Sequence, residues 1–232
     1  MREITDLDTH DLLMIIQQTA FFTSFSAAEQ KLLAGDYTHV VAYDVGEYLI
    51  QEGSTKEKSL FLLLSGGASV VKEGASIPLA TLYPGDIFGE VSFLTSRMRT
   101  SNVIVHPIHT VPTHPPGPIM PDFGALELPV AMREATATAL RFDKELMTHM
   151  DLPFRIQFKD QIIEHLTCRV ELMHEKVVTA TGRDPLLTVD PELEEQLREK
   201  AHSLPELERT KDRLIEQLAE FLDELNHCLV AC

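Results

Sequence analysis

The chain has 232 residues, of which 44% are hydrophobic and 24% charged, a balance that excludes a disordered polymer and a collagen-like fibre. Thirty-six acidic residues against twenty basic ones give a formal net charge of −16, which disfavours binding to nucleic acid, because the phosphate backbone is itself negative. The sequence contains no run of 18 apolar residues, and its N-terminus lacks the basic start and apolar stretch of a signal peptide. It also contains no CxxC pair. We therefore expect a cytoplasmic protein without a membrane span.

Two short helices are predicted within residues 9–34. Apolar residues recur there at helical spacing, from Leu12 to Phe22. Ser26 precedes a run of good helix formers, and Glu29 follows three positions later, which is the capping-box pattern of a helix start. The second helix is therefore expected to begin directly after Ser26.

A glycine-rich stretch follows, with eight glycines between residues 35 and 89. Short runs of β-branched and aliphatic residues lie between these glycines. Such short strands separated by glycine turns are typical of an all-β sandwich, roll or barrel. The predicted strands are residues 38–43, 47–50, 59–64, 68–71 and 79–82.

Residues 105–132 have a different composition. Six of the thirteen prolines lie between Pro107 and Pro121, and so many prolines exclude a regular helix or a central strand. We therefore predict a long loop or insertion at 105–132. A strand-like run resumes at residues 135–140.

A long helix is predicted after residue 151. Its apolar residues recur every three or four positions and form one stripe. The stripe is wider than packing on one β-roll needs, so we expect a homodimer joined along residues 155–177. The residues of the stripe include Ile156, Ile163, Leu166, Val170, Met173 and Val177.

Residues 179–232 are predicted to form an acidic helical extension. Pro191 and Pro205 mark the starts of two helices, and residues 171–232 hold fifteen acidic and seven basic residues. The last helix has a heptad spacing, which favours packing on its own domain and self-association equally. The residues seven apart are Leu207, Leu214, Phe221 and Cys228, and Leu218 and Leu225 are interleaved with them.

The stretch 85–101 carries the candidate binding chemistry. Gly89 lets a ligand approach the backbone at a short helix start, and Arg99 supplies a planar, two-pronged donor for phosphate oxygens. Glu90 is unfavourable beside an anion unless it binds a hydroxyl or pairs with a cation. A ribose cyclic phosphate would use all three residues.

These residues resemble the phosphate-binding cassette of cyclic nucleotide-binding domains, the β-roll of bacterial catabolite-activator-type regulators and protein kinase regulatory subunits. The matching residues are Phe88, Gly89, Glu90, Ser92, Arg99 and Thr100. The resemblance implies a fold that is mainly β plus α. Residues 1–178 would form a jelly-roll-like β-roll with N-terminal helices, the inserted loop and a long C-helix, followed by the extension 179–232.

The resemblance also implies a role for each residue. Arg99 would clamp the cyclic phosphate, Glu90 would accept a hydrogen bond from the ribose 2′-hydroxyl, and Gly89, Ser92 and Thr100 would surround the phosphate. On the register of the C-helix in activator-type proteins, the purine would be faced by Met173 and His174.

The chain departs from this family in its output region. Activator-type regulators carry a winged helix-turn-helix after the C-helix, whereas residues 179–232 contain no basic recognition helix. Neither a catalytic set nor a metal-binding pattern is recognised. We therefore expect no DNA binding, no catalysis and no metal.

The function expected from the sequence is a non-catalytic bacterial sensor of cAMP, or less favourably cGMP, that signals to a partner protein through its C-helix and extension. Thr100 occurs in binders of either nucleotide, so the base stays open. The alternative is a ligand-independent dimeric scaffold that keeps the fold but has lost the ligand.

Overall fold

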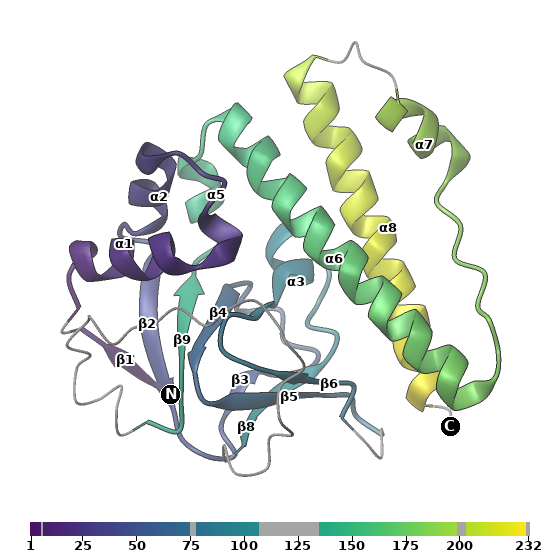
Figure 1. Ribbon diagram of the computed structural model, residues 1–232, viewed down its shortest axis with the longest axis horizontal. Helices are drawn as coiled ribbons and strands as arrows, with labels where there is room; N and C mark the ends of the chain where they lie inside the picture. Colours follow the sequence, from purple (N-terminus) through teal and green to yellow (C-terminus); the bar gives the residue numbers. More distant parts are fainter. Residues whose placement is uncertain (6, 75–77, 107–134, 199–202, 231–232) are drawn as a thin grey trace.

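The computed structural model describes residues 1–5, 7–74, 78–106, 135–198 and 203–230. Two antiparallel sheets face each other as a roll, and helices cover one side of it (Figure 1). The first sheet has the order β1 (Arg2–Ile4), β2 (Thr38–Tyr43), β9 (Ala137–Phe142), β4 (Leu60–Ser65) and β7 (Ile87–Phe88). The second has the order β3 (Tyr48–Ile50), β8 (Asn102–His106), β5 (Gly67–Val71) and β6 (Ala80–Leu82). The predicted β-roll is confirmed.

A row of buried side chains crosses the first sheet and forms part of the core. Val40 pairs with Leu140, Leu140 with Leu62, and Leu62 with Ile87, and all four are at most 3% exposed. β9 therefore lies between two strands that come about 75 to 100 residues earlier in the chain. The predicted insertion 105–132 lies outside the described residues except for 105 and 106, which belong to β8 rather than to a loop.

The N-terminal helices are α1 (Thr9–Gln18), the 3-10 helix η1 (Ala20–Phe22) and α2 (Ala27–Leu33). Ser26 and Glu29 form the predicted capping box. Phe22 packs against Phe142 of β9 and Phe25 stacks on Phe158 of the long helix, so aromatic contacts join these helices to both the roll and the C-terminal half. The short helix α5 (Leu146–His149) follows β9.

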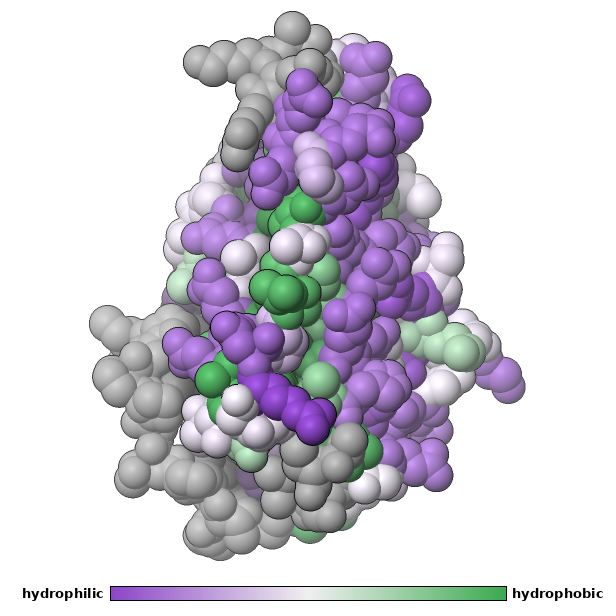
Figure 2. Space-filling model, turned by 90° about the vertical axis from the view of Figure 1, so that its right-hand side faces the viewer, coloured by the Kyte–Doolittle hydropathy of each residue, from purple (hydrophilic) through white to green (hydrophobic). Residues whose placement is uncertain are grey.

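The long helix α6 (Leu152–Thr181) is capped by Asp151 and ends at Gly182, whose φ of 67° is left-handed. After α7 (Pro191–Arg198), the chain forms α8 (Leu204–Val230), which lies beside α6 and runs in the same direction (Figure 1). Ion pairs such as those of Glu208 with Arg155 and Lys159 hold the two helices together. On the side of the molecule that carries α7, a narrow apolar stripe runs between broad polar bands (Figure 2).

The packing of α8 on α6 changes two expectations. Leu166, Met173 and Val177 of the predicted dimer stripe are buried within the single chain, so most of the apolar surface on which the homodimer depended is already covered. The predicted heptad seam is confirmed in one half only, because Cys228 is exposed and Leu207, Leu214 and Phe221 are only partly buried. Leu218 and Leu225, the interleaved positions of that seam, are buried as predicted, together with Ile215 and Leu222.

Candidate functional site

The cassette runs from β7 through Gly89 and the short helix α3 (Glu90–Leu94) to Arg99, just before β8. Gly89 has a φ of 83°. A Cβ at this position would lie 2.8 Å from Nη1 of Arg99 and 3.0 Å from the carbonyl oxygen of Ser59. Glycine is therefore required both by the left-handed backbone and by the close approach of the guanidinium.

Arg99 is a buried cation held by backbone carbonyls. Its Nε donates to Glu57 O at 3.1 Å, Nη1 to Gly89 O at 2.9 Å and Nη2 to Ser59 O at 2.7 Å. The side chain has no ion pair with a carboxylate in the described part of the chain, and burial lowers its pKa to about 10. Arg99 thus stays charged at neutral pH, and both Nη atoms retain a second N–H.

Glu90 is the buried carboxylate of the cassette, at 1% exposure. It forms an ion pair with Arg169 of α6, whose side chain is 33% exposed. This pair joins the cassette directly to the long helix. The residue predicted to accept a ribose hydroxyl therefore already has a cationic partner.

A cavity of about 140 Å³ lies between the cassette, the strands β5 and β6, and the helices α6 and α8. Seven of the eight predicted site residues line it. They are Phe88, Gly89, Glu90, Ser92, Arg99, Thr100 and Met173.

His174 is the exception among the predicted residues. It does not line the cavity, and its Nε2 lies 2.9 Å from Oδ1 of Asp184, beyond the end of α6. Successive residues of a helix are about 100° apart, so when Met173 faces the roll, His174 points sideways. The structure therefore does not bring His174 to the predicted purine site.

Helix α8 supplies a wall that the sequence analysis did not predict. Its residues at the cavity are spaced three and four apart on one helical face, and from α6 the cavity gains Arg169 and Lys176. The spacing of the α8 residues could have indicated from the sequence that they share one helical face, but not which part of the protein that face contacts. The α8 residues at the cavity are Ala219, Leu222, Asp223 and Asn226.

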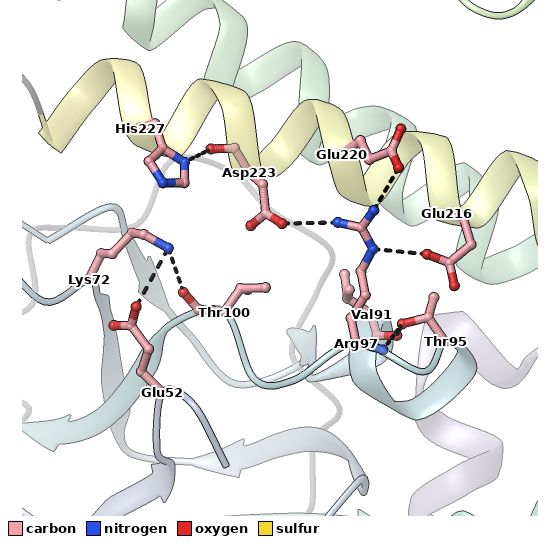
Figure 3. A network of polar contacts seen from close by, with 10 residues as sticks. All are labelled: Glu52, Lys72, Val91, Thr95, Arg97, Thr100, Glu216, Glu220, Asp223 and His227. Carbon is pink, nitrogen blue, oxygen red and sulfur yellow. Dashed lines mark hydrogen bonds and ion pairs between the residues drawn. The ribbon is translucent and has the colours of Figure 1, made fainter. Parts of the chain in front are cut away.

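Arg97 fastens this wall to the cassette. Its guanidinium contacts Glu216 at 2.9 Å, Glu220 at 2.8 Å and Asp223 at 3.1 Å (Figure 3). Burial by itself lowers the pKa of Arg97, but the three carboxylates outweigh it and raise the pKa above its ordinary value. Three acidic side chains of α8 therefore converge on one arginine, two residues before Arg99.

Charges around the cavity are unevenly matched. Glu90 is paired with Arg169, and Asp223 with Arg97. Lys176 donates to the carbonyl oxygen of Leu79, and Arg99 donates only to carbonyls. The described lining thus has an excess of positive charge, which favours an anionic ligand.

The comparison with known families agrees with this geometry. Residues 40–106 match the family described as cyclic nucleotide-binding domain. The chain contains a cyclic nucleotide-binding domain. The matched segment includes the whole cassette with Arg97 and Arg99, while α6 and α8 lie outside it.

Among curated proteins, the cyclic nucleotide-binding domain is similar to the cAMP-dependent protein kinase regulatory subunit of Emericella nidulans. The two are 30% identical over 88 residues, which is 38% of this chain and 21% of the relative. The chain therefore spans about a fifth of the length of that relative.

Two solved structures share the fold at 17% identity and a TM-score of 0.50. One is cAMP-bound PfPKA-R, with 76% of this chain and 48% of that chain covered. The other is a cyclic nucleotide-binding domain from Methylobacillus flagellatus, with 75% and 84% covered. In the described part of the chain, no helix is both long and apolar enough to cross a membrane.

Proposed function

We propose that this protein is a non-catalytic sensor that binds a cyclic nucleotide, cAMP in preference to cGMP, in the cavity between the cassette, α6 and α8. The observation that carries the proposal is Arg99, a buried guanidinium at the cavity whose hydrogen bonds within the described residues all go to uncharged carbonyls. A cation that is desolvated without an anion gains strongly from binding one. The two remaining Nη–H groups match two phosphate oxygens.

The other cassette residues support a ribose cyclic phosphate in particular. Gly89 leaves room beside Arg99, and the hydroxyls of Ser92 and Thr100 border the same space. Glu90 is the acceptor for a ribose hydroxyl. When the ligand binds, Glu90 shares its oxygens between that hydroxyl and Arg169.

The signal in this proposal leaves through the helices. Arg169 connects Glu90 to α6, and Arg97 connects the loop after α3 to α8, so a ligand at the cassette changes contacts of both helices. The acidic helical extension, residues 179–232, is the surface offered to a basic partner protein. A homodimer is not part of the proposal, since most of the stripe that suggested it is buried within the single chain.

Titration calorimetry with cAMP and cGMP tests the proposal. We expect a dissociation constant in the micromolar range, about −8 kcal/mol, and a loss of at least about 100-fold in Arg99→Ala, because the phosphate is then left unpaired. The exposed Arg209→Ala serves as the matched control and keeps full affinity. If the folded wild-type protein binds neither nucleotide at millimolar concentration, the proposed function is refuted.

The second candidate is a ligand-independent scaffold. It is favoured by the position of α8, which leaves a cavity of about 140 Å³, near the size of an engineered cavity that holds benzene. A whole nucleotide then requires α8 to shift. Failure of both titrations, with α8 still protected from hydrogen exchange, would select the scaffold.

A further inference from the structure

Helix α8 crosses the cavity from the loop that carries Arg97 to the β5–β6 turn. At one end Arg97 holds Glu216, Glu220 and Asp223 (Figure 3). At the other end Val230 reaches the β5–β6 turn, where its Cγ1 lies 3.9 Å from the position of a Cβ on Gly74. The part of α8 that lines the cavity, from Ala219 to Asn226, therefore forms a lid over the ligand site, and this lid shifts outward when a whole nucleotide enters.

Asn226 is the residue of this lid that is free to bind a ligand. It is 9% exposed and lines the cavity, yet no hydrogen bond of its carboxamide is found among the described residues. Its neighbour Asp223 has Arg97 as a partner. The carboxamide of Asn226 therefore keeps its donors and its acceptor available to a ligand in the cavity.

The surroundings of Asn226 suit the base of a nucleotide. Arg99 and Gly89 mark the phosphate end of the cavity, while Val70, Leu79 and Ala80 of the second sheet and its β5–β6 connection offer apolar surface for the flat face of a purine. Asn226 is one helical turn beyond Asp223 and one turn before Val230, so it lies on the part of α8 that approaches the β5–β6 turn.

We propose that Asn226 reads the edge of the purine and makes the site select adenine. A carboxamide carries an acceptor and a donor side by side, which match N6–H and N7 of adenine. Guanine presents two acceptors, O6 and N7, on the same edge, so the carbonyl oxygen of Asn226 would face an acceptor. Asn226 is the single carboxamide among the described residues that line the cavity.

This inference rests on the proposed function and adds the residue that chooses the base. Thr100 does not discriminate between adenine and guanine, because its hydroxyl can both donate and accept a hydrogen bond. The side chains of Ala219 and Leu222 have no polar atoms. Selection between cAMP and cGMP is thus assigned to the appended helix α8, outside the segment that matches the family.

The test is calorimetry of wild-type protein and Asn226→Leu with cAMP, cGMP and 7-deaza-cAMP, which lacks the N7 acceptor. The wild-type protein is expected to bind cAMP on the order of tenfold more tightly than either of the other two. In Asn226→Leu the three affinities converge, through weaker binding of cAMP. Glu224→Leu, an exposed position of the same helix, is the matched control and keeps the wild-type preference.

The outcomes separate this inference from the function on which it rests. A wild-type protein that binds neither cAMP nor cGMP refutes the proposed function and the inference together. Binding of cAMP with the same preference in Asn226→Leu as in the wild type overturns the inference alone. Equal affinity of the wild type for cAMP and 7-deaza-cAMP does the same.

Discussion

Replacing Arg97 by alanine removes the three ion pairs that join the cassette to α8. Arg97 is 26% exposed, and its partners Glu216, Glu220 and Asp223 are 43%, 59% and 28% exposed. Pairs with this exposure contribute about 0.5 kcal/mol each. Without the arginine, the three carboxylates also repel one another along the helix by a few tenths of a kcal/mol.

The expected cost of Arg97→Ala is therefore about 1.5–2 kcal/mol for keeping α8 closed over the cavity. A difference of 1.4 kcal/mol corresponds to a factor of ten in an equilibrium constant. Local opening of α8 should then become roughly ten- to thirtyfold more frequent. Hydrogen exchange measured by mass spectrometry on peptides from residues 213–230 detects this directly.

A matched control lies on the same helix. Arg213 makes one ion pair with Asp190 at 3.3 Å, between side chains that are 46% and 44% exposed. Arg213→Ala should change the exchange of α8 less than about threefold. If the amide hydrogens of α8 exchange at the same rate in Arg97→Ala as in Arg213→Ala, the conclusion that Arg97 holds α8 closed over the cavity is wrong.

Two further predictions concern stability. Gly66→Ala should lower the free energy of unfolding, measured in urea, by at least about 3 kcal/mol, because φ at Gly66 is +81° and the new Cβ would lie 2.1 Å from the carbonyl oxygen of Thr136. Gly46 has the same φ but open space around it, so Gly46→Ala should lower the free energy of unfolding by only about 1–2 kcal/mol. Equal losses in the two variants would contradict the role of the contact with Thr136. Burial lowers the pKa of His165 below its ordinary value of 6.5, despite the attraction of Glu90, and its Nε2 has no partner within the described chain. His165 is therefore protonated more readily in the unfolded chain than in the folded protein, so the free energy of unfolding should fall as pH drops below about 6.5. If the free energy of unfolding of a His165→Leu variant depends on pH as steeply as that of the wild type, other groups cause this dependence.

Local features of this protein are predictable from sequence because nearest neighbours determine them. The capping box of Ser26 and Glu29 needs only a four-residue segment, and the predicted strand at 38–43 coincides with β2. The cassette from Phe88 to Thr100 is predictable for the same reason. Its residues lie within one short segment, so a turn, a brief helix and a loop are sufficient to bring Gly89, Glu90 and Arg99 together.

Long-range packing decided the rest. The partners of Arg97 are 119 to 126 residues away in the sequence, and a heptad pattern does not say whether its apolar face meets its own chain or another copy. The rotation of α6 about its axis, set by packing on the roll, brings Met173 to the cavity and sends His174 to Asp184. The sequence by itself thus determined the phosphate end of the site, because those residues are local. The helix wall opposite, with Arg169 and Asn226, was decided by the tertiary structure, because helix docking depends on the summed burial and charge pairing of side chains far apart in the chain.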